Sequence, residues 1–339
     1  MHYDGHCIIV GMPTGLKGTW LWTDVRRIAA LGEPLIELQP IGDGNLRVSF
    51  GGDVANTMVC LKRILRADDF RLAIITALGD SLYSAWLRDR LVRERIKIVE
   101  PPLRGEPGVY GISPDFRRQS TSSYWRGQSA ARQFLHSAKL AQFEELLDEP
   151  QIVIITGITL ALCSAASFKN LCDWIELHLD QCRIVFDSNF RPALWASAKE
   201  AAARIGALER LAATIATSLE DERLLWQAAG VTQVVERLGA LSAEYIIRGG
   251  SEGCWAGAGK HWDHVPATSA TVVDSVGAGD AHLAGYIAAR VKGLARLDAA
   301  RAANRVAAMI VSQHGSMPAE DAVFPNLVAD IIDGSAAST

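Results

Sequence analysis

The sequence lacks the features that mark disulfide-stabilised, membrane-spanning and nucleic-acid-binding proteins. Its six cysteines include no C-x-x-C pair and lie in apolar surroundings, which predicts buried free thiols and a reducing cytoplasmic setting. No run approaches the roughly 20 apolar residues of a membrane span, and the first residues lack the basic start of a signal peptide. The net charge of −4 leaves no basic footprint, so neither nucleic acid nor a membrane is expected as a partner.

Two common nucleotide-binding motifs are missing as well. The chain contains no G-x-x-x-x-G-K-[ST] sequence, and no G-x-G-x-x-G opens a strand–helix unit. A P-loop NTPase and a dinucleotide enzyme are therefore both disfavoured. Histidine pairs at metal-binding spacing are absent too. His261 and His264 are better explained as residues of a solvated hairpin than as metal ligands.

What the chain does contain is an alternation of short apolar strands and amphipathic helices. Strands are expected at residues 27–33, 72–77, 152–156, 183–187, 214–217 and 244–248. Helices are expected at residues 53–65, 81–93, 138–147, 164–178, 198–211 and from 220 onward. This alternation predicts an α/β fold with a mainly parallel sheet covered by helices on both faces, and such sheets bind ligands at the carboxyl ends of their strands.

The organisation predicts one large domain over residues 27–325 with a small additional sheet. Residues 1–26 form an extension that is either an added element or a stretch outside the folded unit, and residues 326–339 form a C-terminal tail. A turn at residues 42–45 predicts a hairpin of strands 35–38 and 46–50. The proline-broken segment 96–126 is expected to add antiparallel strands to this hairpin, forming a lid whose exposed edges allow a homo-oligomer.

The most informative stretch spans residues 272–286, where a predicted short apolar strand runs into Gly277-Ala278-Gly279-Asp280 and a helix. Glycine amides at a helix N-terminus form an anion site. Phosphoryl transfer to an alcohol needs such a cradle, a divalent cation and a carboxylate that faces the acceptor hydroxyl. Asp280 is placed to be that carboxylate; an ordinary strand-to-helix turn is the alternative.

Two motifs together resemble the signatures of the ribokinase-like (PfkB) carbohydrate kinases. They are Gly51-Gly52-Asp53-Val54-Ala55-Asn56 and Asp274-Ser275-Val276-Gly277-Ala278-Gly279-Asp280. Within that family the likeness is strongest to kinases of keto-deoxy sugar acids, through Leu31-Gly32-Glu33, Ser123-Tyr124-Trp125-Arg126 and residues 186–195. The resemblance implies a Rossmann-like central sheet with a β-sheet lid, and transfer from ATP with Mg²⁺ to the 6-hydroxyl of 2-keto-3-deoxygluconate.

The resemblance also implies a role for each candidate site residue. Asp280 would be the general base, and the amides of Gly277, Ala278 and Gly279 the anion hole. The sugar would contact Gly51, Gly52, Asp53, Asn56, Tyr110, Tyr124, Arg126 and Arg191. The nucleotide would contact Ser218, Arg248, Gly250, Gly253, Gly277, Gly279 and Asn304. Asp221 and Glu222 would serve the metal, although an acidic helix N-terminus explains the same two residues.

Two arginines bear on the chemistry of the acceptor. Arg126 and Arg191 come from separate parts of the chain, and a sugar acid's carboxylate matches the planar fork of a guanidinium, whereas a neutral sugar needs no such pair. The alternatives are a solvated lid residue for Arg126 and a structural ion-pair partner for Arg191. Rival functions are a kinase for ribose, fructose, a nucleoside or 2-keto-3-deoxygalactonate, and a non-catalytic sugar-binding regulator.

Overall fold

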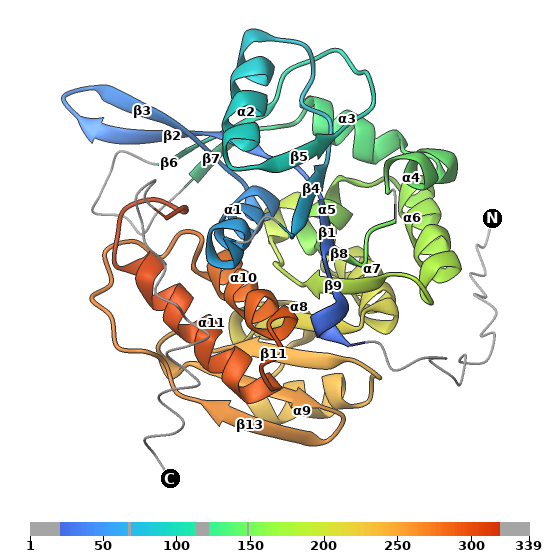
Figure 1. Ribbon diagram of the computed structural model, residues 1–339, viewed down its shortest axis with the longest axis vertical. Coiled ribbons are helices and arrows are strands. Elements are labelled where there is room, and N and C mark those ends of the chain that lie inside the picture. The colour runs from blue at the N-terminus through green and yellow to red at the C-terminus, as the bar shows by residue number, and fades with distance from the viewer. Residues whose placement is uncertain (1–20, 67–68, 113–121, 148, 319–339) are drawn as a thin grey trace.

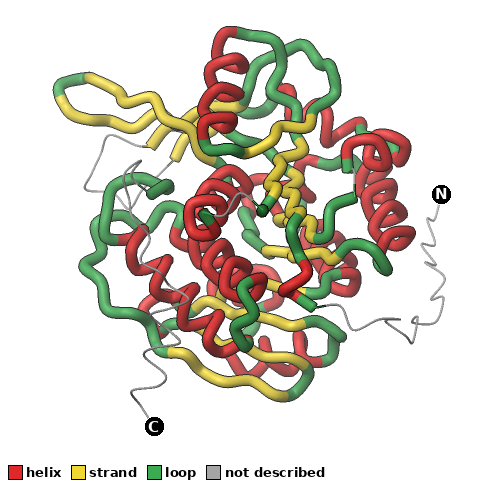
Figure 2. The backbone as a smooth tube through the Cα atoms, viewed as in Figure 1, coloured by secondary structure: helices red, strands yellow, loops and turns green. Residues whose placement is uncertain are grey.

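A nine-stranded sheet runs through the centre of the molecule, and a four-stranded sheet projects from it (Figure 1). The computed structural model describes residues 21–66, 69–112, 122–147 and 149–318. Helices pack against both faces of the large sheet (Figure 2). The predicted α/β fold, with a mostly parallel central sheet and a smaller second sheet, is confirmed.

The central sheet is parallel except for the hairpin at one edge. Its order is β13-β12-β11-β10-β9-β8-β1-β4-β5, and only β12 and β13 run antiparallel to their neighbours. The strands are β1 (Arg27–Leu31), β4 (Arg71–Ile75), β5 (Ile96–Val99), β8 (Ile152–Thr156), β9 (Arg183–Asp187), β10 (Thr214–Ser218), β11 (Glu244–Arg248), β12 (Cys254–Ala258) and β13 (His261–Val265).

The two cores follow from the alternation of side chains along each strand. Ile152 and Ile154 point into one core, and Val153 and Ile155 point into the other, because successive strand residues face opposite sides. The first core is covered by α1 (Asp53–Leu65), α2 (Leu82–Arg93), α10 (Ala278–Val291) and α11 (Arg296–Val311). The second is covered by α3 (Ala130–Ser137), α4 (Leu140–Leu146), α5 (Gly157–Leu162), α6 (Ala165–His178), α7 (Ala198–Leu211), α8 (Leu219–Trp226) and α9 (Val231–Gly239).

The smaller sheet, called here the lid sheet, has the order β3-β2-β6-β7. Its strands are β2 (Leu35–Gly42), β3 (Asn45–Gly51), β6 (Gly108–Ile112) and β7 (Ser122–Trp125). The β2–β3 hairpin is the one predicted from the 42–45 turn, and it extends away from the body of the molecule at the upper left of Figure 1.

Two predictions about the lid are wrong. Residues 96–99 do not join the lid sheet but form β5, which pairs in parallel with β4 at the edge of the central sheet. The apolar side chain of Ile96 is buried there in the first core, to which the lid strands contribute no buried side chain. In addition, β6 pairs with β2 in parallel rather than antiparallel fashion.

Two local predictions also need correction. The helix predicted at 138–147 corresponds to the shorter α4, and Ala138 is the C-cap of α3, a helix that was not predicted. The strand predicted at Val272 and Val273 is absent from the described chain, and both side chains are exposed. Instead, the amides of Val273 and Asp274 donate to the carbonyl of Val311 and so fix this segment to the end of α11. The predictions for residues 1–20 and 326–339 lie outside the described residues.

The cysteines of the described chain are free thiols, as predicted. Cys60, Cys163, Cys182 and Cys254 are buried, and Cys172 is partly buried. Burial raises the pKa of Cys163 to about 12, which keeps the thiol protonated and unreactive. Cys7 lies outside the described residues. Among the described helices, none has the length and hydropathy required to cross a bilayer.

One glycine at the carboxyl edge of the sheet tests this packing. An added Cβ at Gly157, the first residue of α5, would lie 1.9 Å from the carbonyl oxygen of Ser188. Gly157→Ala is therefore expected to lower the free energy of unfolding by about 1–3 kcal/mol, measured by urea denaturation. The control Gly127→Ala places its methyl group in open space and is expected to change stability by less than about 0.5 kcal/mol. Equal effects of the two substitutions on stability would contradict the close packing of Gly157 against Ser188.

Candidate active site

The two glycine-containing motifs meet where α1 and α10 begin. These helices lie side by side in Figure 1. Asn56, in the first turn of α1, donates from Nδ2 to Oδ2 of Asp280, in the first turn of α10, at 2.8 Å. Residues 224 positions apart in the sequence are thereby joined by one hydrogen bond.

Glycine is required at both helix starts for reasons of the fold. Gly52 and Gly277 are the N-caps and have positive φ values of 100° and 77°. An added Cβ would lie 2.6 Å from the Glu33 carbonyl at Gly52 and 2.5 Å from the Ser316 carbonyl at Gly277. At Gly279 the nearest atom would be 3.7 Å away, on Arg248, so packing within the protein leaves room for a methyl group. The absence of a side chain at Gly279 instead leaves space for a ligand.

The start of α10 offers unsatisfied backbone donors. The amide of Ala278 donates to the Ser275 carbonyl at 3.3 Å, so the prediction that it belongs to the anion hole is not supported. The amides of Gly277, Gly279 and Asp280 donate to no acceptor within the described residues. These three amides stand at the positive end of the helix dipole, where an anion is stabilised.

Asp280 has the pKa of a base that works near neutral pH. Burial, followed by the nearby charge of Asp53, raises the pKa of this carboxyl, which is about 7. The hydrogen bond from Asn56 opposes the shift; Asp187 then adds to it and Arg191 again opposes it. A carboxylate with this pKa accepts a proton more readily than an exposed aspartate does.

The two predicted substrate arginines have different surroundings. Arg191 is exposed, and its only hydrogen bond within the described residues is from Nη1 to the Phe190 carbonyl at 3.4 Å. Its charge lowers the pKa of both Asp280 and Asp221, which places it close to these carboxyls. No carboxylate of the described chain forms an ion pair with it, so the interpretation of Arg191 as a structural ion-pair partner is not supported.

Arg126 is buried rather than solvated, so the alternative of a solvated lid residue is wrong. Its Nε donates to Oε2 of Glu33 at 2.7 Å, and Nη2 forms an ion pair with the same oxygen. Oε1 of Glu33 is buried with no hydrogen-bond partner within the described chain. Burial raises the pKa of Glu33, and the charge of Arg126 opposes that shift. Glu33 thus holds Arg126 in place at the base of the lid sheet.

The two tyrosines of the lid sheet lie opposite each other on β6 and β7. The rings of Tyr110 and Tyr124 stack with centroids 5.9 Å apart and planes 23° apart. Tyr124 is exposed, whereas Tyr110 is buried and donates its hydroxyl to the carboxylate of Glu37 on β2. The structure therefore brings Tyr124, but not the hydroxyl of Tyr110, to an open position.

Arg248 is held by a carboxylate that the sequence interpretation did not assign to the site. Its guanidinium donates to both oxygens of Asp187 at 2.7 and 2.6 Å, and to the carbonyl of Gly279 at 3.3 Å. The charge of Asp187 raises the pKa of Arg248 against the effect of burial. The pair joins the ends of β9 and β11 to the start of α10, so Arg248 positions the turn that carries Asp280.

The two predicted metal ligands, Asp221 and Glu222, have different surroundings. The carboxylate of Glu222 already accepts from Arg237 at 2.6 and 3.1 Å and from the Thr217 hydroxyl at 2.9 Å. Asp221 accepts at Oδ2 from the Ser188 hydroxyl at 2.9 Å, and Oδ1 has no hydrogen-bond partner within the described chain. Among the described residues no group of three or more His, Cys, Asp or Glu side chains is arranged to hold a metal ion.

The remaining nucleotide predictions fall on structural positions. Ser218 caps α8 by accepting from the amide of Asp221 at 3.0 Å. Asn304 donates to the carbonyls of Val265 and Pro266 at 3.2 and 2.9 Å, so both amide hydrogens are used inside the protein. Its Oδ1 accepts from Nε2 of His282 at 3.1 Å.

Gly250 and Gly253 flank the 3-10 turn Gly250–Glu252 between β11 and β12. Both have positive φ. An added Cβ at Gly253 would lie 2.2 Å from the Val265 carbonyl, whereas at Gly250 it would meet open space. Gly250 therefore remains the more accessible of the two predicted nucleotide glycines.

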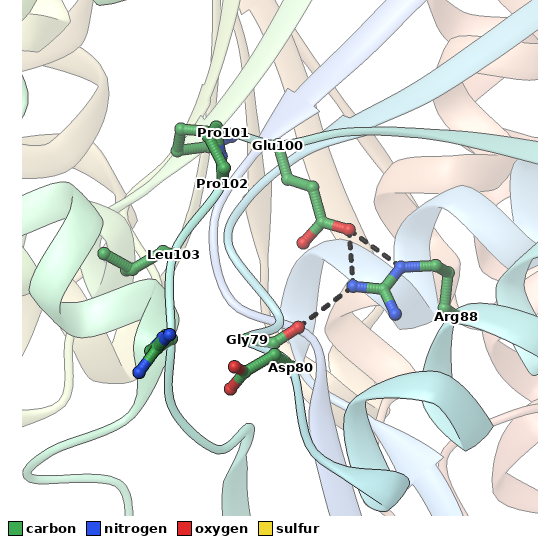
Figure 3. A pocket seen from close by; sticks show the side chains of 8 residues that line it. Gly79, Asp80, Arg88, Glu100, Pro101, Pro102 and Leu103 are labelled. Atoms are coloured by element: carbon green, nitrogen blue, oxygen red, sulfur yellow. Dashed lines mark hydrogen bonds and ion pairs between the residues drawn. The ribbon is translucent and has the colours of Figure 1, made fainter.

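A separate pocket of about 560 Å³ lies at the ends of β4 and β5 (Figure 3). In it Arg88 points at Glu100 and at the carbonyl of Gly79, with Nη2–Oε1 and Nη2–O distances of 2.7 and 3.1 Å. Glu100 also accepts from the amide of Leu78 at 2.9 Å. This ion pair forms part of the pocket wall, and the pocket includes none of the predicted site residues.

Four residues of the site network were missed by sequence reasoning: Glu33, Glu37, Asp187 and Ser316. The three carboxylates carried a usable signal, since each is an acid within or directly after an apolar strand. Ser316 carried none, because it stands among polar residues after the last helix.

Asp280→Asn is expected to change the pH dependence of stability. The folded protein binds this proton more tightly than the unfolded chain does, because the pKa is about 7 in the fold against an ordinary value near 4. Ionised Asp280 therefore lowers the free energy of unfolding progressively as pH rises from about 4 to 7. The stability of the variant relative to the wild type should grow by about 1–3 kcal/mol between pH 5 and pH 8 in urea unfolding. A difference that is constant with pH would contradict the raised pKa.

Comparison with known proteins was made with this geometry in hand. Residues 26–322 match the model of the pfkB family carbohydrate kinases. The chain is 31% identical over 305 residues to 2-dehydro-3-deoxygluconokinase of Dickeya dadantii (strain 3937), with 86% of this chain and 96% of the relative covered. It is 30% identical over 306 residues to 2-dehydro-3-deoxygluconokinase of Escherichia coli (strain K12), with 88% and 99% covered.

Solved structures show the same fold. Aminoimidazole riboside kinase from Salmonella enterica, in complex with aminoimidazole riboside and an ATP analogue, is similar with a TM-score of 0.73 and 20% identity over 90% of this chain and 99% of that chain. Fructokinase from Vibrio cholerae O395, with fructose, ADP and calcium bound, is similar with a TM-score of 0.74 and 18% identity over 86% and 95%. The family match and the relatives together confirm the predicted resemblance: the chain is a sugar kinase that belongs to the pfkB family of carbohydrate kinases.

Proposed function

We propose that this kinase is a 2-dehydro-3-deoxygluconokinase, which transfers the γ-phosphoryl group of ATP to the 6-hydroxyl of 2-keto-3-deoxy-D-gluconate. The observation that carries the proposal is the placement of Asp280. A carboxyl with a pKa of about 7 stands beside helix amides and close to the exposed guanidinium of Arg191, and neither the amides nor the guanidinium is paired with a carboxylate of the described residues. The names of the relatives at 30–31% identity support the same acceptor.

The chemistry follows from the groups around Asp280. Asp280 takes the proton of the 6-hydroxyl as the bond from that oxygen to the γ-phosphorus forms and the bond to the β-phosphate oxygen breaks, releasing ADP. The amides of Gly277 and Gly279 stabilise the negative charge on the transferred group. Because Gly279 has no side chain, the phosphoryl group has room to approach these amides closely.

Magnesium ions prefer oxygen ligands, keep several waters, and neutralise charge on the phosphates of a nucleotide. Asp221 fits such an ion, because its Oδ1 has no hydrogen-bond partner within the described chain. Glu222 does not fit it, since Arg237 and Thr217 already occupy both oxygens. We therefore assign the contact with Mg²⁺, direct or through water, to Asp221 alone.

The acceptor's carboxylate is assigned to Arg191, and a contact with the sugar from the lid sheet is assigned to Tyr124. An exposed arginine that forms no ion pair with the described part of the chain is available to bind a carboxylate through two parallel hydrogen bonds. Arg126 takes a supporting part, because Glu33 already occupies Nε and Nη2. Asp53 and Asn56 are the partners for the sugar hydroxyls, as both lie within the same cluster as Asp280.

We also infer that the lid hairpin is the surface at which two copies of this chain pair. Ile41, Leu46 and Val48 lie on β2 and β3 with 54%, 54% and 46% of their surfaces exposed. Apolar side chains grouped on an exposed hairpin favour association with a second copy of the same surface.

A panel of acceptors tests the proposed function. With ATP, kcat/KM is expected to be about 100-fold or more higher for the two keto-deoxy sugar acids than for ribose, fructose or a nucleoside, because Arg191 has no partner in a neutral sugar. Asp280→Asn should lower kcat by about 100-fold or more and leave the Kd for the sugar acid nearly unchanged. Preference for a neutral sugar would reject the acceptor, and turnover retained in the variant would reject Asp280 as the base.

Arg191→Ala separates acceptor binding from nucleotide binding. The Kd for the sugar acid is expected to rise about 10- to 100-fold, which corresponds to the loss of charged hydrogen bonds, and the Kd for ATP should stay within about 3-fold. Isothermal titration measures both. Arg210→Ala is the matched control. This exposed arginine lies at the end of α7, near the amino end of β10, whereas Arg191 follows the carboxyl end of β9. Equal weakening of both ligands would indicate a structural role for Arg191.

A further inference from the structure

A continuous chain of side-chain hydrogen bonds links Asp280 to the lid sheet. Asn56 donates from Nδ2 to Asp280 at 2.8 Å, and its Oδ1 lies 3.1 Å from the hydroxyl of Ser316. The same hydroxyl lies 3.3 Å from Oε2 of Glu37, which also accepts from Tyr110. Glu37 and Tyr110 belong to β2 and β6, so the chain crosses from the catalytic helix to the lid.

Ser316 is closely packed at the centre of this chain. It is 2% exposed. An added Cβ at Gly277 would lie 2.9 Å from the Ser316 Cβ, and one at Gly51 would lie 3.4 Å from the Ser316 hydroxyl. Glycines of both kinase motifs therefore make the room in which this serine sits, although the residue itself lies outside both motifs.

The hydroxyl of Ser316 has one hydrogen and faces two acceptors. The ionised form of Glu37 is the stronger acceptor, because a hydrogen bond to a charged group is shorter and stronger than one to an amide oxygen. When Glu37 is ionised it takes the hydrogen, and Oδ1 of Asn56 then faces a lone pair. When Glu37 is protonated, it donates to Ser316, and Ser316 donates to Asn56.

These two arrangements act differently on Asp280. A hydrogen bond received at Oδ1 fixes the Asn56 amide with Nδ2 toward Asp280 and polarises the amide, which strengthens donation from Nδ2. Donation to the ionised carboxylate favours that form. Without it, the amide is free to turn its oxygen toward the carboxylate, which disfavours the ionised form.

We propose that Ser316 is a positioning residue whose single hydroxyl hydrogen is shared between Glu37 and Asn56, so that the protonation state of a lid carboxyl sets how strongly Asn56 stabilises ionised Asp280. The effect on catalysis rests on the proposed role of Asp280 as the base. The structural coupling itself requires only the hydrogen bonds described above.

The surroundings of Glu37 favour its protonated form more than those of an exposed glutamate would. Burial raises its pKa, the hydroxyls of Ser49 and Ser316 oppose the shift, and the charge of Asp274 adds to it. Its hydrogen-bond partners within the described chain are hydroxyl groups, and no cation of that part pairs with it.

Other charges also act on Asp280, but through space. Asp53 and Asp187 raise its pKa and Arg191 lowers it, and the charge of Asp280 in turn raises the pKa of Arg248. None of these four groups is hydrogen-bonded to Ser316 in the described chain. An experiment on the coupling must therefore distinguish a path through Ser316 from the removal of a charge.

A double-substitution cycle on the free protein makes this distinction. The pKa of Asp280 is measured by carboxyl carbon-13 NMR titration, which needs neither substrate nor turnover. The wild type exchanges between the two arrangements as Glu37 titrates. Glu37→Gln keeps the arrangement in which Ser316 donates to Asn56 and is expected to lower the pKa of Asp280 by about 0.5–1, whereas Ser316→Ala removes that donation and should raise the pKa by a similar amount. In the protein that already carries Ser316→Ala, Glu37→Gln is expected to have no further effect.

Ser84→Ala serves as the matched control. Ser84, on α2, is also a buried serine, but its hydroxyl donates to the carbonyl of Leu78 and not to Asn56 or Glu37. The substitution should leave the pKa of Asp280 unchanged. The proposal is overturned if Ser316→Ala leaves that pKa unchanged, or if Glu37→Gln shifts it equally with and without Ser316→Ala, since the charge would then act through space.

The acid limb of the kcat/KM profile gives the functional readout. It should move with the pKa of Asp280 in each variant. Coupling seen by NMR in a protein without sugar-acid turnover would reject the proposed function alone. An active kinase without coupling would reject only this inference.

Discussion

The hydrogen bond from Asn56 to Asp280 is the constraint on which the rest of the site depends. It joins the first turn of α1 to the first turn of α10, so the two helices must begin next to each other. Backbone conformations that only glycine adopts easily, at Gly52 and Gly277, set those two starting points. The same bond offsets part of the cost of burying a carboxylate, and it leaves Asp280 balanced between its two charge states near neutral pH.

Around that bond the molecule separates charges that are satisfied within the fold from charges that are left for ligands. Arg248 is neutralised by Asp187, Arg126 by Glu33, and Arg237 by Glu209 and Glu222. Such buried pairs are costly to assemble, and they contribute mainly by holding geometry. Arg191 has no such partner in the described chain, and the contrast singles it out as a binding group more clearly than its sequence context does.

Much of the fold was predictable because strand and helix periods are local properties. The hairpin of β2 and β3, the helix from Asp53 and six of the parallel strands were predicted. Which sheet a strand joins is not local: the segment at Ile96 looked like a lid strand, but the buried surface beside β4 decided its place. Likewise, the motifs located Asp280, while the partners of Arg126 and Glu222 depend on distant residues. Ser316 offered no pattern at all, because its role arises only from what packs around it.

The packing of Ser316 against Gly277 has a consequence for how the molecule is made. The centre is assembled from residues that run from Glu33 in the first turn after β1 to Ser316 beyond α11, which spans nearly the whole of the matched family region. A ribosome adds this serine after the other residues of the network. Until that residue has emerged and folded back between the two glycine motifs, the nascent chain holds Asp280 without the contact that completes the link to the lid.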